Sequence, residues 1–149
     1  MSLELALRTH LLSKTPITDI VGQRVAFGAI EPSADKLPDV LFAQLDASFT
    51  STLDGDGEDL QFPFFEFACR SFDPTDVMTL ANLIRRSLRE LATGATITTS
   101  LGDVVIEQLV ISGEEDQATA FEGQGLARLL HSRSIVVQVG YRFAVAAVS

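Results

Sequence analysis

The sequence predicts a single α+β domain in which two helices pack on one face of a mostly antiparallel sheet, with an extended hairpin loop. Residues 2–14 and 74–93 have the apolar spacing of helices, and several other segments are rich in β-branched and aromatic residues. The expected order is α–β–β–β–α–β–β–β, which favours helices gathered on one side of a sheet. The whole chain, 1–149, is expected to form this one domain, because a chain of this length can bury its own core.

The first helix is expected over residues 2–14. Leu3, Leu7 and Leu11 recur every four residues and would share one buried face. Pro16 ends this helix, and residues 17–21 are expected to add one further helical turn.

The second helix has clearer ends. Asp73 is the expected N-cap and Pro74 the first helical residue, where a missing N–H costs nothing. Gly94 is expected to end the helix, because glycine adopts the positive φ of a helix stop. Between these ends runs one apolar stripe made by Val77, Leu80, Ala81, Ile84, Leu88 and Leu91.

The strands are predicted from β-branched and aromatic runs bounded by turn residues. The segment 61–72 is the strongest, because its phenylalanines and Cys69 alternate along the chain. Residues 113–125 are expected to be a polar loop and 126–130 a helical turn. The remaining strands are expected at 24–30, 40–50, 95–100, 103–112 and 133–148.

The composition limits the classes of function. With 46% hydrophobic and 21% charged residues the chain is typical of a folded protein, and its formal net charge is −9. An acidic chain with scattered basic residues is expected to repel nucleic acid rather than bind it. No leader and no apolar run of about 20 residues is evident, so we expect a protein that is made in the cytoplasm and does not enter a membrane.

No catalytic residue, metal ligand or cofactor is predicted. The glycines form neither a phosphate-binding loop nor a dinucleotide motif. Asp54, Asp56 and Glu58 resemble the start of a calcium loop, but Asp59 and Phe65 stand where such a loop needs glycine and glutamate. A nucleophilic role for Cys69 with His10 or His131 is disfavoured, because a cysteine in an apolar strand usually behaves as a small buried hydrophobic residue.

Two charged segments are the candidate subunit or partner interface. Residues 52–60 place four acids and two glycines in a loop, where the acids would set orientation and two leucines would anchor the contact. Three arginines share the polar side of the second helix and are either solvated or paired with carboxylates of a neighbouring copy. The candidate residues are Leu53, Asp54, Asp56, Glu58, Asp59, Leu60, Arg85, Arg86 and Arg89.

Several segments also resemble the tail completion and tail terminator proteins of long-tailed bacteriophages and gene transfer particles. The match to a V-G-x-R-[VI] turn is made by 21–25, and the match to an L-P-x-[VL] strand start by 37–40. Residues 64–88 resemble the strand and amphipathic helix of that family, and 133–143 its final strand.

This resemblance implies a non-enzymatic virion protein that forms a homo-oligomeric ring, typically a hexamer. The ring would end the tail tube and join it to the head connector or stopper protein, and DNA would pass through it without specific binding. The protein would lie in the tail or neck of the particle. Two alternatives stay open from the residues alone: a small intracellular module that binds a ligand or peptide without forming a ring, and an enzyme that uses Cys69.

Overall fold

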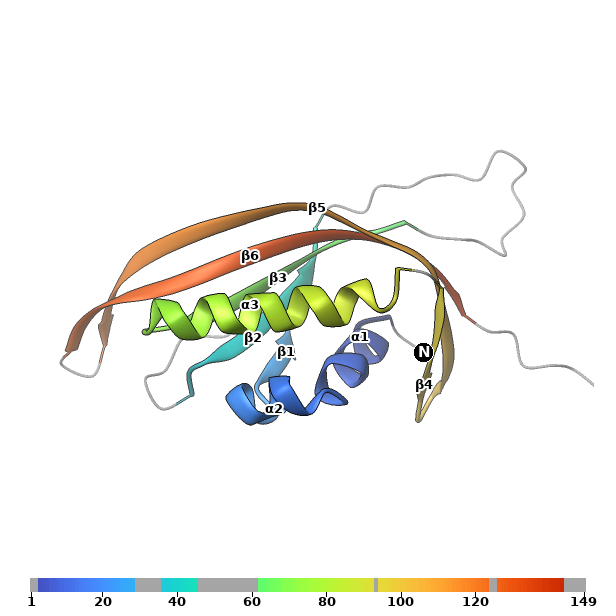
Figure 1. Ribbon diagram of the computed structural model, residues 1–149, viewed down its shortest axis with the longest axis horizontal. Coiled ribbons are helices and arrows are strands. Elements are labelled where there is room, and N and C mark those ends of the chain that lie inside the picture. Colours follow the sequence, from blue (N-terminus) through green and yellow to red (C-terminus); the bar gives the residue numbers. More distant parts are fainter. Residues whose placement is uncertain (1–2, 29–35, 46–61, 93, 124–125, 144–149) are drawn as a thin grey trace, which may run out of the picture.

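The computed structural model describes residues 3–28, 36–45, 62–92, 94–123 and 126–143. Within these residues the chain forms three helices and six strands (Figure 1). In chain order they are α1 (Leu3–Leu12), α2 (Thr15–Val21), β1 (Val25–Phe27), β2 (Asp39–Gln44), β3 (Phe64–Ser71), α3 (Pro74–Arg89), β4 (Ala95–Thr99), β5 (Gly102–Gly123) and β6 (Leu126–Phe143).

The strands form one six-stranded sheet in the order β1-β2-β3-β6-β5-β4. The α+β class is therefore confirmed, but two details of the expectation are wrong. The sheet is mixed, because β1 pairs with β2 in parallel while the other neighbours are antiparallel. The described residues form three helices instead of two, because Lys14 and Pro16 break the first helical segment and residues 15–21 continue as the separate helix α2.

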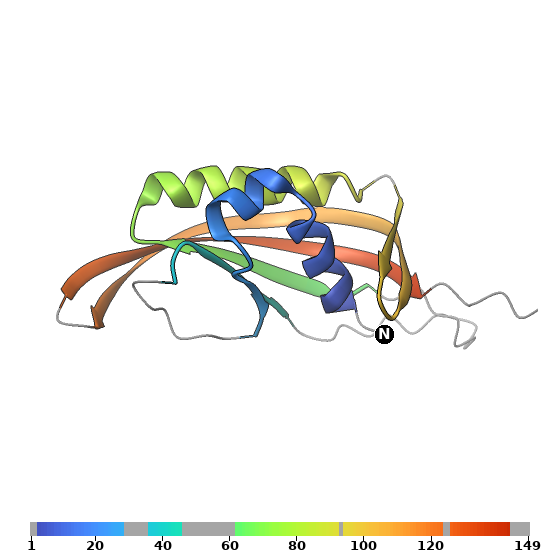
Figure 2. The ribbon, with the colours of Figure 1, turned by 90° about the horizontal axis from the view of Figure 1, so that it is seen from below.

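The helices all lie on the concave side of the curved sheet. Figures 1 and 2 show the strands arching over α3, with α1 and α2 beside it on the same side. The core fills the space between these layers. Phe42, Phe65 and Phe67 are completely or almost completely buried, and the rings of Phe42 and Phe67 stack with centroids 5.2 Å apart. Across the core α3 buries Val77, Leu80, Ala81, Ile84 and Leu88.

The N-terminal end of α3 is as expected. The Asp73 carboxylate accepts a hydrogen bond of 2.9 Å from the backbone N–H of Thr75, and Pro74 begins the helix. The C-terminal end comes earlier than expected. The helix ends at Arg89, and a short turn leads to Gly94, whose φ of 90° is the positive value anticipated for a stop.

The largest error of the sequence prediction concerns residues 113–130. The expected polar loop at 113–125 is wrong, because β5 continues as a strand to Gly123. The expected helical turn at 126–130 is also wrong, because β6 begins at Leu126. The two strands pair along their whole shared length, from Val104 opposite Phe143 to Gly123 opposite Leu126. Cross-strand hydrogen bonding, which needs no apolar alternation, keeps this exposed segment extended.

The other strands occupy parts of the expected segments. The strand expected at 40–50 is β2, whose last residue is Gln44, and the strand expected at 24–30 is β1, whose last residue is Phe27. The strand expected at 61–72 is β3, and its burial alternates as anticipated, with Phe65, Phe67 and Cys69 facing the helices. The hairpin loop expected at 52–60 lies outside the described residues, as do residues 29–30, 46–50 and 144–148 of the expected strands.

Candidate functional site

The candidate interface residues fall into two groups. Those in the acidic loop, Leu53 to Leu60, lie outside the described residues, so that part of the prediction remains a prediction. The three arginines lie on α3, and the structure separates their roles. Arg85 is half-buried, whereas Arg86 and Arg89 are exposed.

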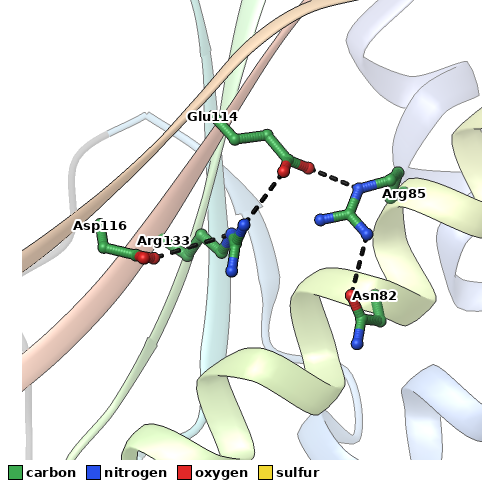
Figure 3. Close-up of polar contacts among 5 residues, drawn as sticks. All are labelled: Asn82, Arg85, Glu114, Asp116 and Arg133. Carbon is green, nitrogen blue, oxygen red and sulfur yellow. Dashed lines mark hydrogen bonds and ion pairs between the residues drawn. The ribbon is translucent and has the colours of Figure 1, made fainter.

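Arg85 belongs to a charged network between α3 and the β5–β6 hairpin (Figure 3). Its Nε donates to Glu114 Oε1 over 2.5 Å, and its Nη1 donates to Asn82 Oδ1 over 2.9 Å. The second oxygen of Glu114 accepts a hydrogen bond of 3.1 Å from Arg133 Nη2. The Nε of Arg133 lies 3.7 Å from Asp116 Oδ1, within range of an ion pair but too far for a hydrogen bond.

The register of the hairpin explains why these charges meet. Asp116 and Arg133 stand directly opposite each other, and Glu114 lies two residues along β5 from Asp116, on the same face of the sheet. That face is the concave one, since Ile135, opposite Glu114, is part of the core. The two arginines and two carboxylates sum to zero charge. The network therefore fastens the hairpin to α3 without leaving an excess charge between them.

The electrostatic consequence is clearest at Glu114. Hydrogen bonding from Arg85 is the largest effect that holds the pKa of this carboxyl below its usual value, and Arg133 lowers the pKa further. Arg85 is thus engaged within its own chain. A neighbouring copy could recruit it only by competing with Glu114.

Arg86 and Arg89 differ from Arg85. No ion pair or side-chain hydrogen bond joins either of them to another residue in the described ranges. Together they give the exposed side of the C-terminal half of α3 two positive charges. Of the three predicted arginines, these two have the guanidinium groups that are available to a partner.

Cys69 is placed as the sequence indicated. Its side chain is fully buried in the core, and burial raises the pKa of its thiol to about 12. A thiol of this kind is protonated at neutral pH and is shielded from reagents. His10 lies elsewhere, on α1, where its Nε2–H donates to the Ser87 carbonyl over 2.7 Å. His131 lies on β6, where it stands opposite Ser71 of β3.

The structure adds two general observations. Among the described residues there is no group of three or more His, Cys, Asp or Glu side chains placed to hold a metal ion. None of the helices in those same ranges is long and apolar enough to cross a membrane.

The sequence prediction missed one prominent feature, the length of the β5–β6 hairpin. Its far end extends past the N-terminal end of α3 and past the end of β3 (Figures 1 and 2). Residues 113–120 are all exposed, so no periodic burial marks them as a strand. The threonine and phenylalanine in the segment Gln117–Phe121, which contains no glycine or proline, were the available signal.

Comparisons with known proteins identify a shared fold but no family. No protein-family model matches the sequence. A search of curated proteins also finds no match. Among solved structures, a chain of the virion of a native gene transfer agent particle has a similar structure, with a TM-score of 0.65 over 95% of each chain. The two sequences are 15% identical, so this similarity concerns the fold.

Proposed function

We propose that this protein is a structural subunit of a phage-like particle. The observation that carries the proposal is the match in fold, over 95% of both chains, to a chain of a gene transfer agent virion. The match covers nearly the whole domain and not just a common motif. The resemblance of residues 21–25, 37–40 and 64–88 to tail completion and tail terminator proteins points to the same kind of particle.

Within such a particle, the role that we propose is that of a ring, most simply a hexamer, at the end of the tail tube. The ring would stop tube growth and bind the head connector. Its chemistry would be that of surfaces and not of a reacting site, and the buried, protonated Cys69 thiol fits a protein that does no nucleophilic chemistry. Six copies would carry a formal charge of 6 × −9 = −54. A ring of that charge would repel the phosphates of DNA passing through it.

Arg86 and Arg89 are the described residues best suited to the subunit contact. Both are exposed and have no ion-pair partner in the described ranges, whereas the chain as a whole is acidic. An acidic segment of the next copy, such as residues 52–60, would supply the opposite charge in a head-to-tail contact. Such a contact between exposed charges weakens in added salt, because the charges are screened over about 10 Å at 0.1 M ionic strength.

A genetic experiment tests this role. Particles would be prepared from cells in which the gene is deleted, and from the same cells complemented with the unmodified gene. The proposal predicts filled heads separated from tails whose lengths vary, and complementation should restore joined particles. Normal joined particles from the deleted strain would contradict the proposal. In that case the alternative hypothesis to test would be a small module that binds a ligand or peptide.

A further inference from the structure

The far end of the β5–β6 hairpin is a two-stranded arm. The pairing of β6 with β3 ends at His131 opposite Ser71, and beyond that point β6 pairs with β5 alone in the described residues. The arm consists of the last five register pairs, from Thr119 opposite Leu130 to Gly123 opposite Leu126. At roughly 3.3 Å per residue, five pairs project about 16 Å beyond the sheet.

An arm of this kind needs a covering surface. Two-stranded ribbons are marginally stable in water unless a third strand or a helix packs against them. The body of the protein contacts the arm at Phe72, where the Arg128 guanidinium carbon lies 5.1 Å from the centre of the ring. Leu129, one residue further along, is 54% exposed. Because a two-stranded ribbon is marginal by itself, this exposed leucine marks a point where another molecule could pack against the arm.

Charge favours a second copy of this chain as that molecule. Residues 119–130 hold one acid, Glu122, and one base, Arg128, so their net charge is 0. The remaining residues therefore carry the entire net charge of −9. Two such bodies repel each other, whereas a neutral arm can approach a second body without that cost.

The edge of β5 that faces away from β6 also differs between the body and the arm. β4 pairs only with residues 102–106, which leaves the rest of this edge without a strand partner in the described residues. Near the body this edge carries three acidic residues, Glu114, Glu115 and Asp116, and the strand has two register shifts. Charges and irregularities of this kind on an edge strand oppose its pairing with a further strand. Residues 119–121, in the arm, carry neither a charge nor a register shift.

A receiving surface lies at the opposite end of the same hairpin. Leu101, in the turn between β4 and β5, is 61% exposed, the highest value among the large apolar side chains of the described residues. It lies 19 positions along β5 from Ala120, the residue opposite Leu129, which is about 60 Å of strand. A ring needs two different, complementary patches on each subunit, and these two ends provide them.

We propose that the arm of one copy packs, through Leu129, against the β4–β5 turn of the next copy around Leu101. The inference rests on the ring proposed above and adds an apolar contact between its subunits to the charged contact proposed there.

Disulfide trapping tests this contact directly. The variant carrying both Leu101→Cys and Leu129→Cys would be oxidised with copper phenanthroline at high protein concentration and run on a denaturing gel without reductant. Within one chain the two positions are far beyond the ~7 Å that a disulfide spans, so any adduct joins different copies. Cys69 adds no background, because it is fully buried. The expected result is a ladder from dimer upward, and reductant should abolish it.

The controls decide which idea fails. Met78 on α3 is 56% exposed, so Met78→Cys with Leu129→Cys is a matched pair that should give no ladder. An equal ladder from that pair, or dimers from Leu129→Cys alone, would overturn the head-to-tail contact. Rings of the unmodified protein in electron micrographs, without a ladder from the Leu101 and Leu129 pair, would overturn the arm contact but leave the proposed function standing. A protein with neither rings nor a ladder would overturn both.

Discussion

Replacing Phe67, which lies on the interior strand β3, by alanine should strongly destabilise the protein. Phe67 is fully buried, it lies opposite Phe42 on β2 and Ile135 on β6, and its ring stacks on Phe42 at an interplanar angle of 14°. Removing a buried phenylalanine side chain costs about 3–5 kcal/mol, from lost transfer energy and from the cavity that remains. Domains of this size are stable by roughly 5–15 kcal/mol, so the variant should still fold.

The assay is urea unfolding followed by circular dichroism. With a denaturant slope of about 2 kcal/mol per molar urea, the expected loss lowers the midpoint by about 2 M. Phe27→Ala is the matched control, because Phe27 is 51% exposed and meets Phe42 only edge-on at 5.5 Å. Its cost should be about 1 kcal/mol, from the half of the ring that is buried. A midpoint for Phe67→Ala that is no lower than that of Phe27→Ala would refute the assignment of the core.

Four further outcomes are expected. Glu114 has a lowered pKa in the folded protein, so its stabilising effect is present above its unfolded pKa and is lost as pH falls through the folded value. Glu114→Gln should therefore flatten the fall in the free energy of unfolding below about pH 4.3, and an unchanged pH profile would argue against the network. Cys69 should react with a thiol reagent only upon unfolding, and fast labelling of the native protein would show that β3 is misplaced. Asp73→Ala should cost about 1 kcal/mol of stability in urea, since it removes the N-cap bond to Thr75; no loss would mean that this cap is not formed in solution. The acids of the predicted loop are Asp54, Asp56, Glu58 and Asp59, and replacing all four by serine should preserve the fold but weaken assembly, most visibly at low salt. Full assembly at every salt concentration would show that the loop is not part of the interface.

The sequence predicted those elements that have one buried and one exposed face. In β3, burial alternates residue by residue, and in α3 the buried residues follow the helical repeat, so both patterns are visible without a structure. Residues 113–120 carry no such pattern because all of them are exposed. They form a strand because β6 pairs with them, and a pairing partner beyond a turn leaves no mark on local periodicity.

The same reason limits the prediction of the site. The three arginines were identified together by their spacing on one helix, but spacing gave no means of separating Arg85 from Arg86 and Arg89. Arg85 is distinguished by a carboxylate 29 residues away in the chain, which reaches it only because the hairpin folds back over α3. The parallel pairing of β1 with β2 was also missed, because the direction of neighbouring strands depends on the connection between them and not on their own composition.

Electron micrographs of the purified protein, averaged in projection, test the central claim most directly. The account predicts closed rings, six-fold in end views, whose number rises with protein concentration and falls with added salt. The same preparation at several concentrations, measured by sedimentation, should show a discrete species at six times the monomer mass. A protein that stays monomeric at every concentration and salt level, with no rings in the images, would contradict the claim that this chain is a ring-forming virion subunit.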